Sequence, residues 1–303
     1  MYIGSGVEHE WHLPPAPPWR TFPRRKVGHV FNPPAGLVDA VNAAICLRRP
    51  LLLTGHPGSG KSTVIESVAD ELNLGPVLRW HITSRSTLAD ALYRYDVLGR
   101  IHAQQLASSA ADDISTFIQL GPLGTALLPA EIPRPLLIDE IDKSDLDLPS
   151  DLLDVLERGY FEIIELSRLD RRESVPIRQW ASRLEFPIVN GIVQCSEFPF
   201  IVMTSNGERD FPAPFLRRCI RFDMPAPTVE SISAIVAAHL SLEDVASDQM
   251  NMVVTFVDRV LAGETLAIDQ LLNAIFLISE DRGIAEADMK AVIDTLLRDL
   301  TRG

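Results

Sequence analysis

Two kinds of apolar pattern alternate along residues 36–222 of the chain. Some segments are short and continuously apolar, which is typical of a strand buried on both faces. Others repeat an apolar residue every three or four positions, which is typical of a helix that packs one face against a core. The segments predicted to be strands are residues 51–54, 77–82, 136–140, 198–204 and 219–222.

The helical spacing predicts a second set of elements between these strands. Gly159 directly follows one of them and is the residue type that most often ends a helix. The region from residue 96 to 130 is less regular, and Gly121-Pro122-Leu123-Gly124 is expected to interrupt a helix there. The segments predicted to be helical are residues 36–47, 62–74, 88–95, 112–120, 125–128, 151–158 and 212–218.

A turn is expected at Asn190-Gly191, because this dipeptide favours the two-residue turns that join antiparallel strands. Apolar segments at residues 186–189 and 192–195 flank the turn. The sequence therefore predicts a β-hairpin whose two strands pair with each other. Upstream of it, residues 161–166 alternate between apolar and polar positions and lead to Ser167.

The C-terminal part of the chain has a different pattern. After the linker sequence Pro225-Ala226-Pro227-Thr228, the apolar residues follow helical spacing throughout. This part is therefore expected to form a smaller, all-helical domain. Its predicted helices are residues 229–240, 248–261, 268–278 and 286–300.

The N-terminal residues 1–28 are rich in proline, which fixes φ and lacks a hydrogen-bond donor, so an extended tail is expected. Trp11, Trp19 and Phe22 could pin this tail to the body as a packed strap. A proline-rich ligand for a partner is the alternative. The basic cluster Arg24-Arg25-Lys26 is interpreted as a solvated surface.

One glycine-rich segment carries the clearest chemistry. From Gly55 the sequence reads Gly-His-Pro-Gly-Ser-Gly-Lys-Ser-Thr, which fits the phosphate-binding pattern G-x-x-x-x-G-K-[ST] between a strand and a helix. The glycines let successive N–H groups turn inward, and the helix adds its positive end. Lys61 is expected to reach the β- and γ-phosphates, and Ser62 to offer its hydroxyl to Mg²⁺. The expected nucleotide-binding residues are Gly55, His56, Pro57, Gly58, Ser59, Gly60, Lys61, Ser62, Thr63 and Asp139.

Two adjacent carboxylates end the apolar strand at residues 136–140. Asp139 is expected beside the glycine loop, where with Ser62 it would bind Mg²⁺ through the metal's waters. Glu140 could take a proton from an attacking water. With a phosphate-binding loop upstream, this interpretation is preferred to a strand that merely ends in acidic residues.

Polar residues also flank the last two predicted strands of this region. Asn206 comes directly after an apolar strand, where an asparagine usually forms a turn but could also hold the attacking water. Arg217 and Arg218 stand between a short helix and the last strand. On their own, two arginines indicate no more than surface charge.

Composition and charge narrow the class of protein. The chain has 303 residues, of which 46% are hydrophobic and 23% charged, as in ordinary globular proteins with room for one large and one smaller domain. No apolar run approaches the ~18 residues of a membrane span, and the N-terminus lacks a signal pattern. The three scattered cysteines, Cys46, Cys195 and Cys219, are expected to be buried free thiols of a cytoplasmic protein. The formal net charge of −13 argues against binding of duplex DNA.

The order of these motifs resembles that of an AAA+ ATPase, and of the MoxR branch in particular. The resemblance covers about residues 29–303. Leu120-Gly121-Pro122-Leu123 and the predicted hairpin at Asn190-Gly191 look like the helix insert and the pre-sensor hairpin of that branch. The resemblance to the family rests on four motifs. They are the phosphate-binding loop, Leu136-Leu137-Ile138-Asp139-Glu140-Ile141-Asp142, Thr204-Ser205-Asn206 and Phe215-Leu216-Arg217-Arg218.

The resemblance implies a fold of the α/β class. It is the P-loop NTPase fold, a three-layer α/β/α sandwich around a parallel five-stranded sheet, followed by a C-terminal all-α lid domain. The domains implied are a proline-rich tail at 1–28, a nucleotide-binding domain at 29–225 and a lid at 226–303. Within the second, a helix insert is expected at about 96–130 and a β-hairpin insert at about 160–197.

The resemblance also implies roles and partners. Asn206 corresponds to sensor 1, and Arg218, aided by Arg217, to the arginine finger that reaches the nucleotide of a ring neighbour. With Glu140 these are the expected catalytic residues, and ATP and Mg²⁺ are the expected cofactors. The implied assembly is a homo-oligomeric ring, a hexamer by resemblance. Its implied function is that of a chaperone for a partner protein, and related ATPases often act on von Willebrand A-type proteins.

One departure from the family bears on mechanism. The family usually carries a sensor 2 arginine early in the third lid helix, where this chain reads Leu266-Ala267-Ile268-Asp269-Gln270-Leu271. A nucleotide-operated assembly switch with slow hydrolysis, in signalling or defence, is therefore the alternative to an ATP-driven remodeller. A nucleic-acid motor is a third interpretation, against which the acidic charge and the lack of basic, aromatic-rich stretches argue.

Overall fold

The computed structural model describes residues 6–8, 10, 15–21, 31–106, 113–168, 174–226, 228–240, 247–264, 266–278, 293 and 295–297. None of the helices in these residues combines the length and the apolar character that a membrane span requires. The described residues divide into two compact units. One comprises Pro33–Gly55 and Gly60–Met224, and the other the described parts of Met1–Asn32, His56–Ser59 and Pro225–Gly303.

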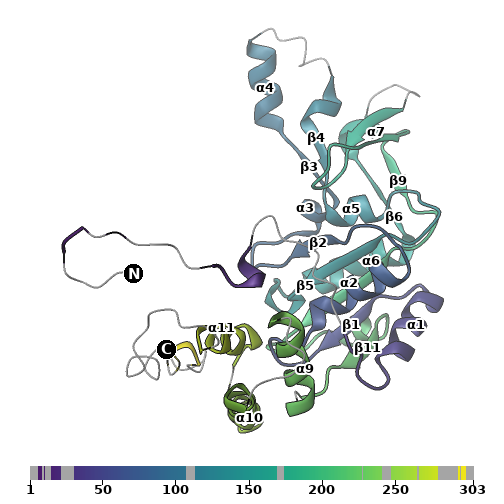
Figure 1. Ribbon diagram of the computed structural model, residues 1–303. Coiled ribbons are helices and arrows are strands. Elements are labelled where there is room, and N and C mark those ends of the chain that lie inside the picture. The colour runs from purple at the N-terminus through teal and green to yellow at the C-terminus, as the bar shows by residue number, and fades with distance from the viewer. Residues whose placement is uncertain are drawn as a thin grey trace. The chain divides into compact units, whose positions relative to one another are not determined.

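A five-stranded sheet forms the centre of the larger unit, with strand order β11-β1-β10-β5-β2 (Figure 1). All four pairs of neighbouring strands are parallel, which confirms the predicted parallel sheet. The inner strands are almost entirely buried because their apolar runs face packed layers on both sides. The strands are β1 (Leu51–Thr54), β2 (Leu78–His81), β5 (Pro135–Asp139), β10 (Phe200–Ser205) and β11 (Ile220–Asp223).

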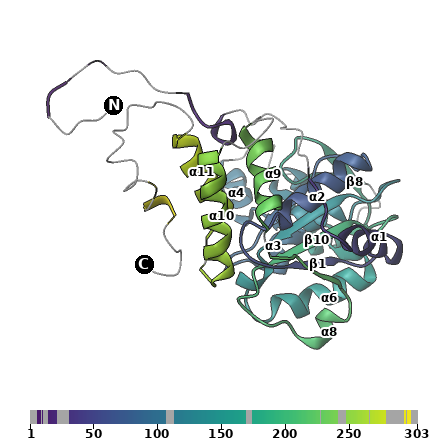
Figure 2. The same ribbon diagram turned by 60° about the horizontal axis from the view of Figure 1, so that its bottom comes forward.

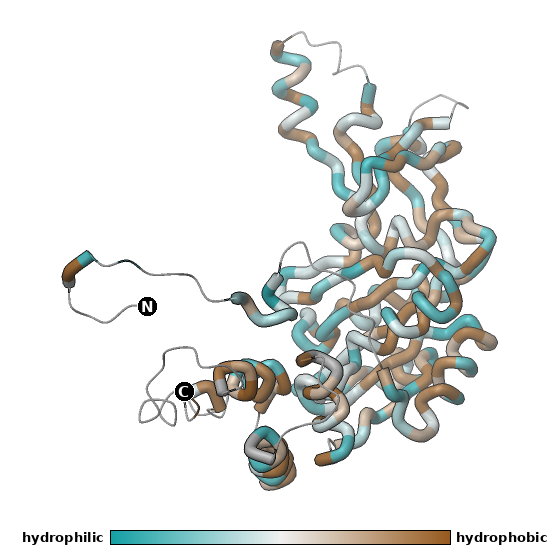
Figure 3. Tube along the Cα trace, viewed as in Figure 1, coloured by the Kyte–Doolittle hydropathy of each residue, from teal (hydrophilic) through white to brown (hydrophobic). Residues whose placement is uncertain are grey.

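Helices pack against this sheet at the positions expected from their spacing. α1 (Leu37–Leu47) contacts β1 and β11, and α2 (Lys61–Glu71) contacts β5 and β10. α6 (Leu148–Arg158) ends at Gly159, whose φ of 64° is the left-handed conformation that glycine adopts without strain, as predicted. α8 (Ala213–Leu216) is the short helix that precedes β11. Figure 3 has the same view as Figure 1, and much of the trace in the region of the sheet is brown, the colour of hydrophobic residues.

A second sheet, of order β3-β4-β7-β8, corrects two helix predictions. The predicted helix 88–95 ends early, as α3 (Leu88–Leu92), and its last residues form β3 (Tyr93–Tyr95). Most of the predicted helix 112–120 is instead a 3₁₀ helix, η3 (Ile114–Phe117), and a strand, β4 (Ile118–Leu120). These short apolar segments satisfy both periodicities, so only pairing with a neighbour decides between helix and strand.

The third correction concerns α5 (Pro122–Ala126), which begins inside the sequence that was expected to interrupt a helix. Pro122 occupies the first turn, where the missing N–H of proline has no intrahelical partner in any case. The region predicted to be irregular also contains α4 (Val97–Gln105). Figure 1 shows α4 standing apart from the five-stranded sheet, joined to the unit through β3 and β4.

The predicted hairpin at Asn190-Gly191 is wrong in its pairing. Both residues have positive φ, 55° and 71°, so the turn itself is present. However, β8 (Glu185–Ile188) pairs with β7 (Val175–Arg178), and β9 (Ile192–Gln194) pairs with β6 (Tyr160–Glu162). A single bridge between Val189 and Ile192 is what remains between the flanking segments. The alternating segment 161–166 likewise splits into part of β6 and a short helix, α7 (Ile164–Ser167).

In the smaller unit, α9 (Val229–Leu240), α10 (Ser247–Leu261) and α11 (Ile268–Ile278) pack against one another (Figure 2). These helices confirm three of the four predicted in this part of the chain. The fourth, at 286–300, lies mostly outside the described residues. The helices share a core that includes Val236, Phe256 and Ile275.

Trp19 lies in a short 3₁₀ helix, η1 (Pro18–Arg20), and packs on α11. Its indole Nε1 donates to Asn273 Oδ1 over 3.1 Å, and its ring meets Phe276 edge to face at 5.4 Å. These contacts support the packed strap at Trp19. Trp11, Phe22 and Arg24-Arg25-Lys26 lie outside the described residues.

The cysteines differ in burial. Cys219 is buried and Cys195 half-buried, but Cys46 is exposed, so the prediction of buried thiols is wrong for Cys46. Cys46 lies on α1, and its neighbour Ala44 faces the core instead. All three are free thiols.

Candidate active site

The glycine-rich loop links β1 to α2, as its sequence pattern requires. Gly58 and Gly60 have φ of 77° and 81°, a region that strains other residues, so both positions need glycine. Lys61, the first residue of α2, is 7% exposed, and its Nζ donates to the carbonyl oxygen of Gly55 over 2.7 Å. The ammonium group of Lys61 therefore binds a backbone oxygen at the start of the same loop.

Burial lowers the pKa of Lys61 from its ordinary value, and Asp142, Asp139 and Glu140 oppose this shift through their negative charges. Asp139 ends β5, and Glu140 and Asp142 follow it, so the sheet places the acidic strand end against the start of α2. This arrangement favours the protonated lysine. A protonated Lys61 is the form that can bind phosphate oxygens.

Asp139 receives two hydroxyl donors on the same oxygen. Ser62 Oγ donates to its Oδ1 over 2.8 Å, and Thr204 Oγ1 donates to it over 2.6 Å. Ser62 comes from α2 and Thr204 from β10, so three elements converge on one carboxylate. The carboxylate and hydroxyl oxygens of Asp139 and Ser62 are the hard ligands that Mg²⁺ prefers.

Glu140 begins the turn after β5 and has a φ of 60°, which is uncommon for a residue other than glycine. Its backbone N–H donates to Thr204 Oγ1 over 2.9 Å, which anchors this turn to β10. Its carboxylate faces three polar side chains. Lys143 Nζ lies 2.8 Å from Oε2, His81 Nε2 lies 3.8 Å from Oε2, and Asn206 Nδ2 lies 3.4 Å from Oε1.

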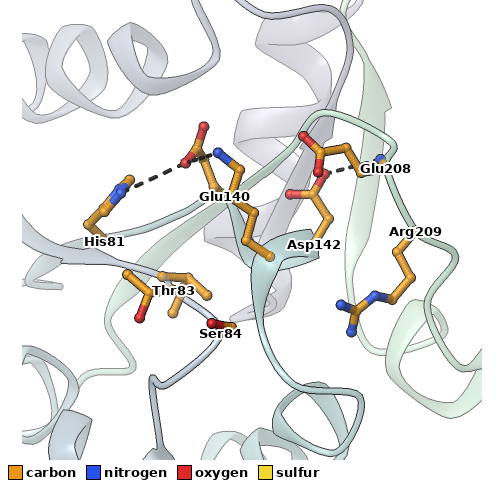
Figure 4. A pocket seen from close by; sticks show the side chains of 9 residues that line it. His81, Thr83, Ser84, Glu140, Asp142, Glu208 and Arg209 are labelled. Atoms are coloured by element: carbon orange, nitrogen blue, oxygen red, sulfur yellow. Dashed lines mark hydrogen bonds and ion pairs between the residues drawn. The ribbon is translucent and has the colours of Figure 1, made fainter. Parts of the chain in front are cut away.

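A pocket of about 490 Å³ opens beside this carboxylate. Figure 4 shows His81 and Glu140 pointing toward one another, with Asp142 next to Glu208 on the other side of the pocket. The carboxyl ends of β2, β5 and β10 supply most of the lining, as is usual for ligand sites in parallel sheets. The lining residues are His81, Ile82, Thr83, Ser84, Glu140, Asp142, Lys143, Glu208 and Arg209.

Arg217 and Arg218 lie elsewhere on the larger unit, after α8. Arg218 Nε is paired with the carboxylate of Glu157 on α6, and its Nη1 donates to the carbonyl oxygen of Pro214 over 3.1 Å. Arg217 is exposed, and its carbonyl oxygen accepts a hydrogen bond from Arg49 Nη1 over 3.2 Å. Within the described part of the chain, the Arg218 guanidinium therefore contacts Glu157 and Pro214.

The structure adds residues that the sequence reasoning did not single out for chemistry. Lys143, His81, Asp142 and Thr204 all contact the predicted site residues. Asp142 and Thr204 stand within the motifs that carried the family resemblance, so their position offered a signal. The position of His81 at the end of a strand was also a signal in the sequence. No feature of the sequence around Lys143 indicated a role.

The loop also satisfies a test for phosphate binding. The Ser59 hydroxyl oxygen is buried without a hydrogen-bond partner among the described residues. A buried polar group without a partner costs free energy, and a ligand is one explanation for such a group. The hydroxyl of Ser59 and the ammonium of Lys61 are both donors, so this loop fits an anion.

A phosphate-binding loop between a strand and a helix, beside a neighbouring strand that ends in acids, defines a P-loop nucleoside triphosphatase. The predicted fold class is thus confirmed. Residues 50–219 match the family described as AAA domain (dynein-related subfamily), and because this is more than half of the chain, the protein belongs to that family of AAA+ ATPases.

Comparisons with individual proteins do not define the protein more closely than the family does. No curated protein matches the chain. Among solved structures, NtrX from Brucella abortus in complex with ADP matches with a TM-score of 0.42 and 13% sequence identity. The match covers 81% of this chain and 49% of that one, so the chain spans about half the length of that structure.

Proposed function

We propose that the protein binds ATP with Mg²⁺ and hydrolyses the bond between the β- and γ-phosphates. The observation that carries this proposal is the convergence of Ser62, Thr204 and Asp139, with Glu140 next in the chain. Membership of the AAA family supports nucleotide binding. The preference for adenine over guanine rests on that family membership alone, because the loop contacts phosphates and not the base.

Each residue has a role that its geometry supports. Lys61 leaves the carbonyl oxygen of Gly55 and binds the β- and γ-phosphate oxygens. Mg²⁺, when bound, would neutralise charge on the phosphate oxygens, and Ser62 and Asp139 would hold it. Glu140 takes a proton from the attacking water, and the Asn206 amide, beside the Glu140 carboxylate, orients that water.

The ion pair with Lys143 bears on the activity of Glu140. The ammonium group of Lys143 binds Glu140 Oε2 over 2.8 Å, so that oxygen is occupied while the pair is closed. The arrangement therefore corresponds to a state in which the base is not yet engaged with water. Rotation of Lys143, which is 41% exposed, would release it.

We further propose that the site is completed between subunits of a ring. AAA+ proteins commonly assemble into rings. Arg218, with Arg217 beside it, would supply the guanidinium to the nucleotide of a neighbouring copy, and the hexamer is the proposed size. Residues 226–303 would act as the lid and residues 29–225 as the nucleotide-binding domain, with the inserts at about 96–130 and 160–197.

The biological role proposed is that of a MoxR-type chaperone that remodels a partner protein, with a von Willebrand A-type protein as one candidate. A nucleotide-operated assembly switch with slow hydrolysis is the second candidate. The observation that favours the switch is that α11 begins Ile268-Asp269-Gln270, without a cation for the γ-phosphate.

Steady-state ATP turnover of the full chain tests the enzymatic part of the proposal. Turnover should depend on Mg²⁺ and be lost in Glu140→Gln, with Glu71→Gln on the same unit as an exposed control carboxylate. Turnover in wild type that is measurable but stays slow under every condition, with ATP binding intact, would support the switch. GTP in place of ATP tests the base preference.

A pull-down separates the possible roles. Glu140→Gln is expected to stay in the ATP-bound state and retain the partner protein, while Lys61→Ala should not. Stimulation of turnover by the captured protein supports the remodeller. Stimulation by DNA alone would instead support a nucleic-acid motor.

A further inference from the structure

Asp142 joins two loops at the centre of the site. It belongs to a 3₁₀ helix, η4 (Ile141–Lys143), directly after β5, and is 2% exposed. Its Oδ2 accepts the backbone N–H of Asn206 over 2.8 Å and that of Glu208 over 3.2 Å. Asn206 and Glu208 follow β10, which is the parallel neighbour of β5. One buried carboxylate oxygen therefore fixes the loop after β10 to the turn after β5.

This clamp has a consequence for the Asn206 side chain. Asn206 Nδ2 lies 3.4 Å from Glu140 Oε1, at the long end of the hydrogen-bond range. The intervening Gly207 has a φ of 78° and nothing within 4 Å of the position its Cβ would take, so local packing does not hold this loop. Gly207 N–H donates to Ser205 Oγ over 3.0 Å within the loop itself, whereas the two hydrogen bonds to Asp142 join the loop to the turn that carries the candidate base.

The second oxygen of Asp142 makes the residue unusual. Oδ1 is buried without a hydrogen-bond partner among the described residues. A buried carboxylate with one unsatisfied oxygen destabilises the fold, because that oxygen has lost its hydrogen bonds to water. An asparagine would offer the same acceptor oxygen to both N–H groups. The negative charge is not required for the clamp, although it opposes the lowering of the Lys61 pKa by burial.

We propose that Asp142 is a positioning residue. It holds the Asn206 side-chain amide next to the Glu140 carboxylate, so that both groups bind the same water. The inference rests on the proposed ATPase activity, because it assigns a role within that reaction. Asp142 touches neither phosphate nor water in this role. It acts through the backbone of Asn206.

Three variants of the full chain test the clamp by its kinetics. Asp142→Ala removes the acceptor and should lower kcat about 10- to 100-fold, the range expected for a displaced catalytic group, with ATP affinity within about threefold of wild type. Asp142→Asn retains one acceptor oxygen and should restore kcat to within about threefold of wild type. Asp145→Ala is the matched control, because Asp145 is exposed and accepts one N–H, from Asp147, over 3.4 Å. It should leave kcat unchanged.

A double-mutant cycle shows whether Asp142 acts through Asn206. If it does, Asp142→Ala combined with Asn206→Ala should be no slower than Asn206→Ala alone, within about twofold. Multiplicative losses would mean that the two residues act independently, which overturns the proposal. Equal loss of kcat in Asp142→Asn and Asp142→Ala would also overturn it, because the charge would then matter and not the acceptor.

Amide hydrogen exchange tests the clamp without any activity. In wild type, the N–H groups of Asn206 and Glu208 should exchange slowly, and in Asp142→Ala both should exchange faster, with Asp142→Asn close to wild type. Rapid exchange of both amides in wild type overturns the clamp even if Asp142→Ala does not fold. Absence of ATP turnover in wild type with slow exchange of these amides would count against the proposed function and leave the clamp itself supported.

Discussion

The guanidinium of Arg218 is paired with the carboxylate of Glu157 in the same chain. The side chains are 37% and 55% exposed. Exposed ion pairs contribute little to stability because water and salt screen them and because ordering two long side chains costs entropy. The pair can therefore open at little cost, as the proposed role of Arg218 at the nucleotide of a neighbouring subunit would require.

Arg218→Ala should bind ATP as wild type does but lose turnover by ~10³ or more, the size of arginine-finger effects. The reason is that the loop around Lys61 stays intact while a guanidinium for the γ-phosphate is lost. Lysine cannot replace its planar fork, so Arg218→Lys should also be slow. ATP affinity by calorimetry and turnover by phosphate release check both parts, and Arg217→Ala is expected to share the defect in part.

Two further measurements separate a shared site from a structural arginine. Glu157→Gln breaks the same ion pair and should keep turnover within about twofold of wild type, because the pair is exposed. Mixing Lys61→Ala with Arg218→Ala places intact pockets against intact arginines at some interfaces, so part of the activity should return. Mixed assemblies that form but stay inactive would refute the assignment in trans.

Lys61→Ala should abolish nucleotide binding, since it removes the charge-assisted contact to phosphate. The lowered pKa of Lys61 adds a pH dependence. The ammonium form predominates below that pKa, so affinity should decline as pH rises through it, at lower pH than an ordinary lysine with a pKa of 10.5 would give. Calorimetric titration across alkaline pH checks this, and an affinity of Lys61→Ala within twofold of wild type would contradict it.

Glu140→Gln should still bind ATP and Mg²⁺ but turn over at least ~100-fold more slowly, because glutamine keeps the shape and loses the base. Asp139→Asn should instead weaken Mg²⁺-dependent binding, because Asp139 accepts the Ser62 hydroxyl at the expected metal position. Titration of Mg²⁺ at fixed ATP distinguishes the two. Normal turnover in both variants would show that neither Asp139 nor Glu140 has the role proposed for it.

The lid is expected to respond weakly to nucleotide. The start of α11, Ile268-Asp269-Gln270, offers no cation to a γ-phosphate. Hydrogen exchange of residues 228–278 with and without a non-hydrolysable ATP analogue measures the response, with the Lys61 segment as the internal positive control. Strong protection of residues 266–272 on binding would show that the lid senses nucleotide by other groups.

The cysteines should differ in reactivity. Burial raises the pKa of the Cys219 thiol to about 12, so almost none of it is thiolate at pH 8. Cys46 is exposed. Iodoacetamide at pH 8 should therefore label Cys46 in the native protein, Cys195 more slowly, and Cys219 only after denaturation. Peptide mass spectrometry reads the three sites separately, and rapid native labelling of Cys219 would show that β11 opens.

The sequence alone determined the features that depend on neighbouring residues. The phosphate-binding loop, the acid-tipped β5 and helices α9 to α11 follow from local spacing. Strands with continuous apolar runs were also predictable, because short runs of that kind bounded by turn residues are typical of strands buried on both faces. The glycine positions of the loop were predictable for the same local reason, since φ above zero is a property of one residue.

Tertiary structure decided what depends on residues far apart in the chain. The strands on either side of Asn190-Gly191 pair with β7 and β6 and not with each other, because hydrogen bonding and burial there depend on segments that meet only in the folded unit. The pair Arg218–Glu157 and the hydrogen bonds of Asp142 to the loop after β10 likewise could not be predicted from the sequence. A local pattern reports which face of an element is buried, but only the packed sheet determines which polar groups then lie within hydrogen-bonding distance.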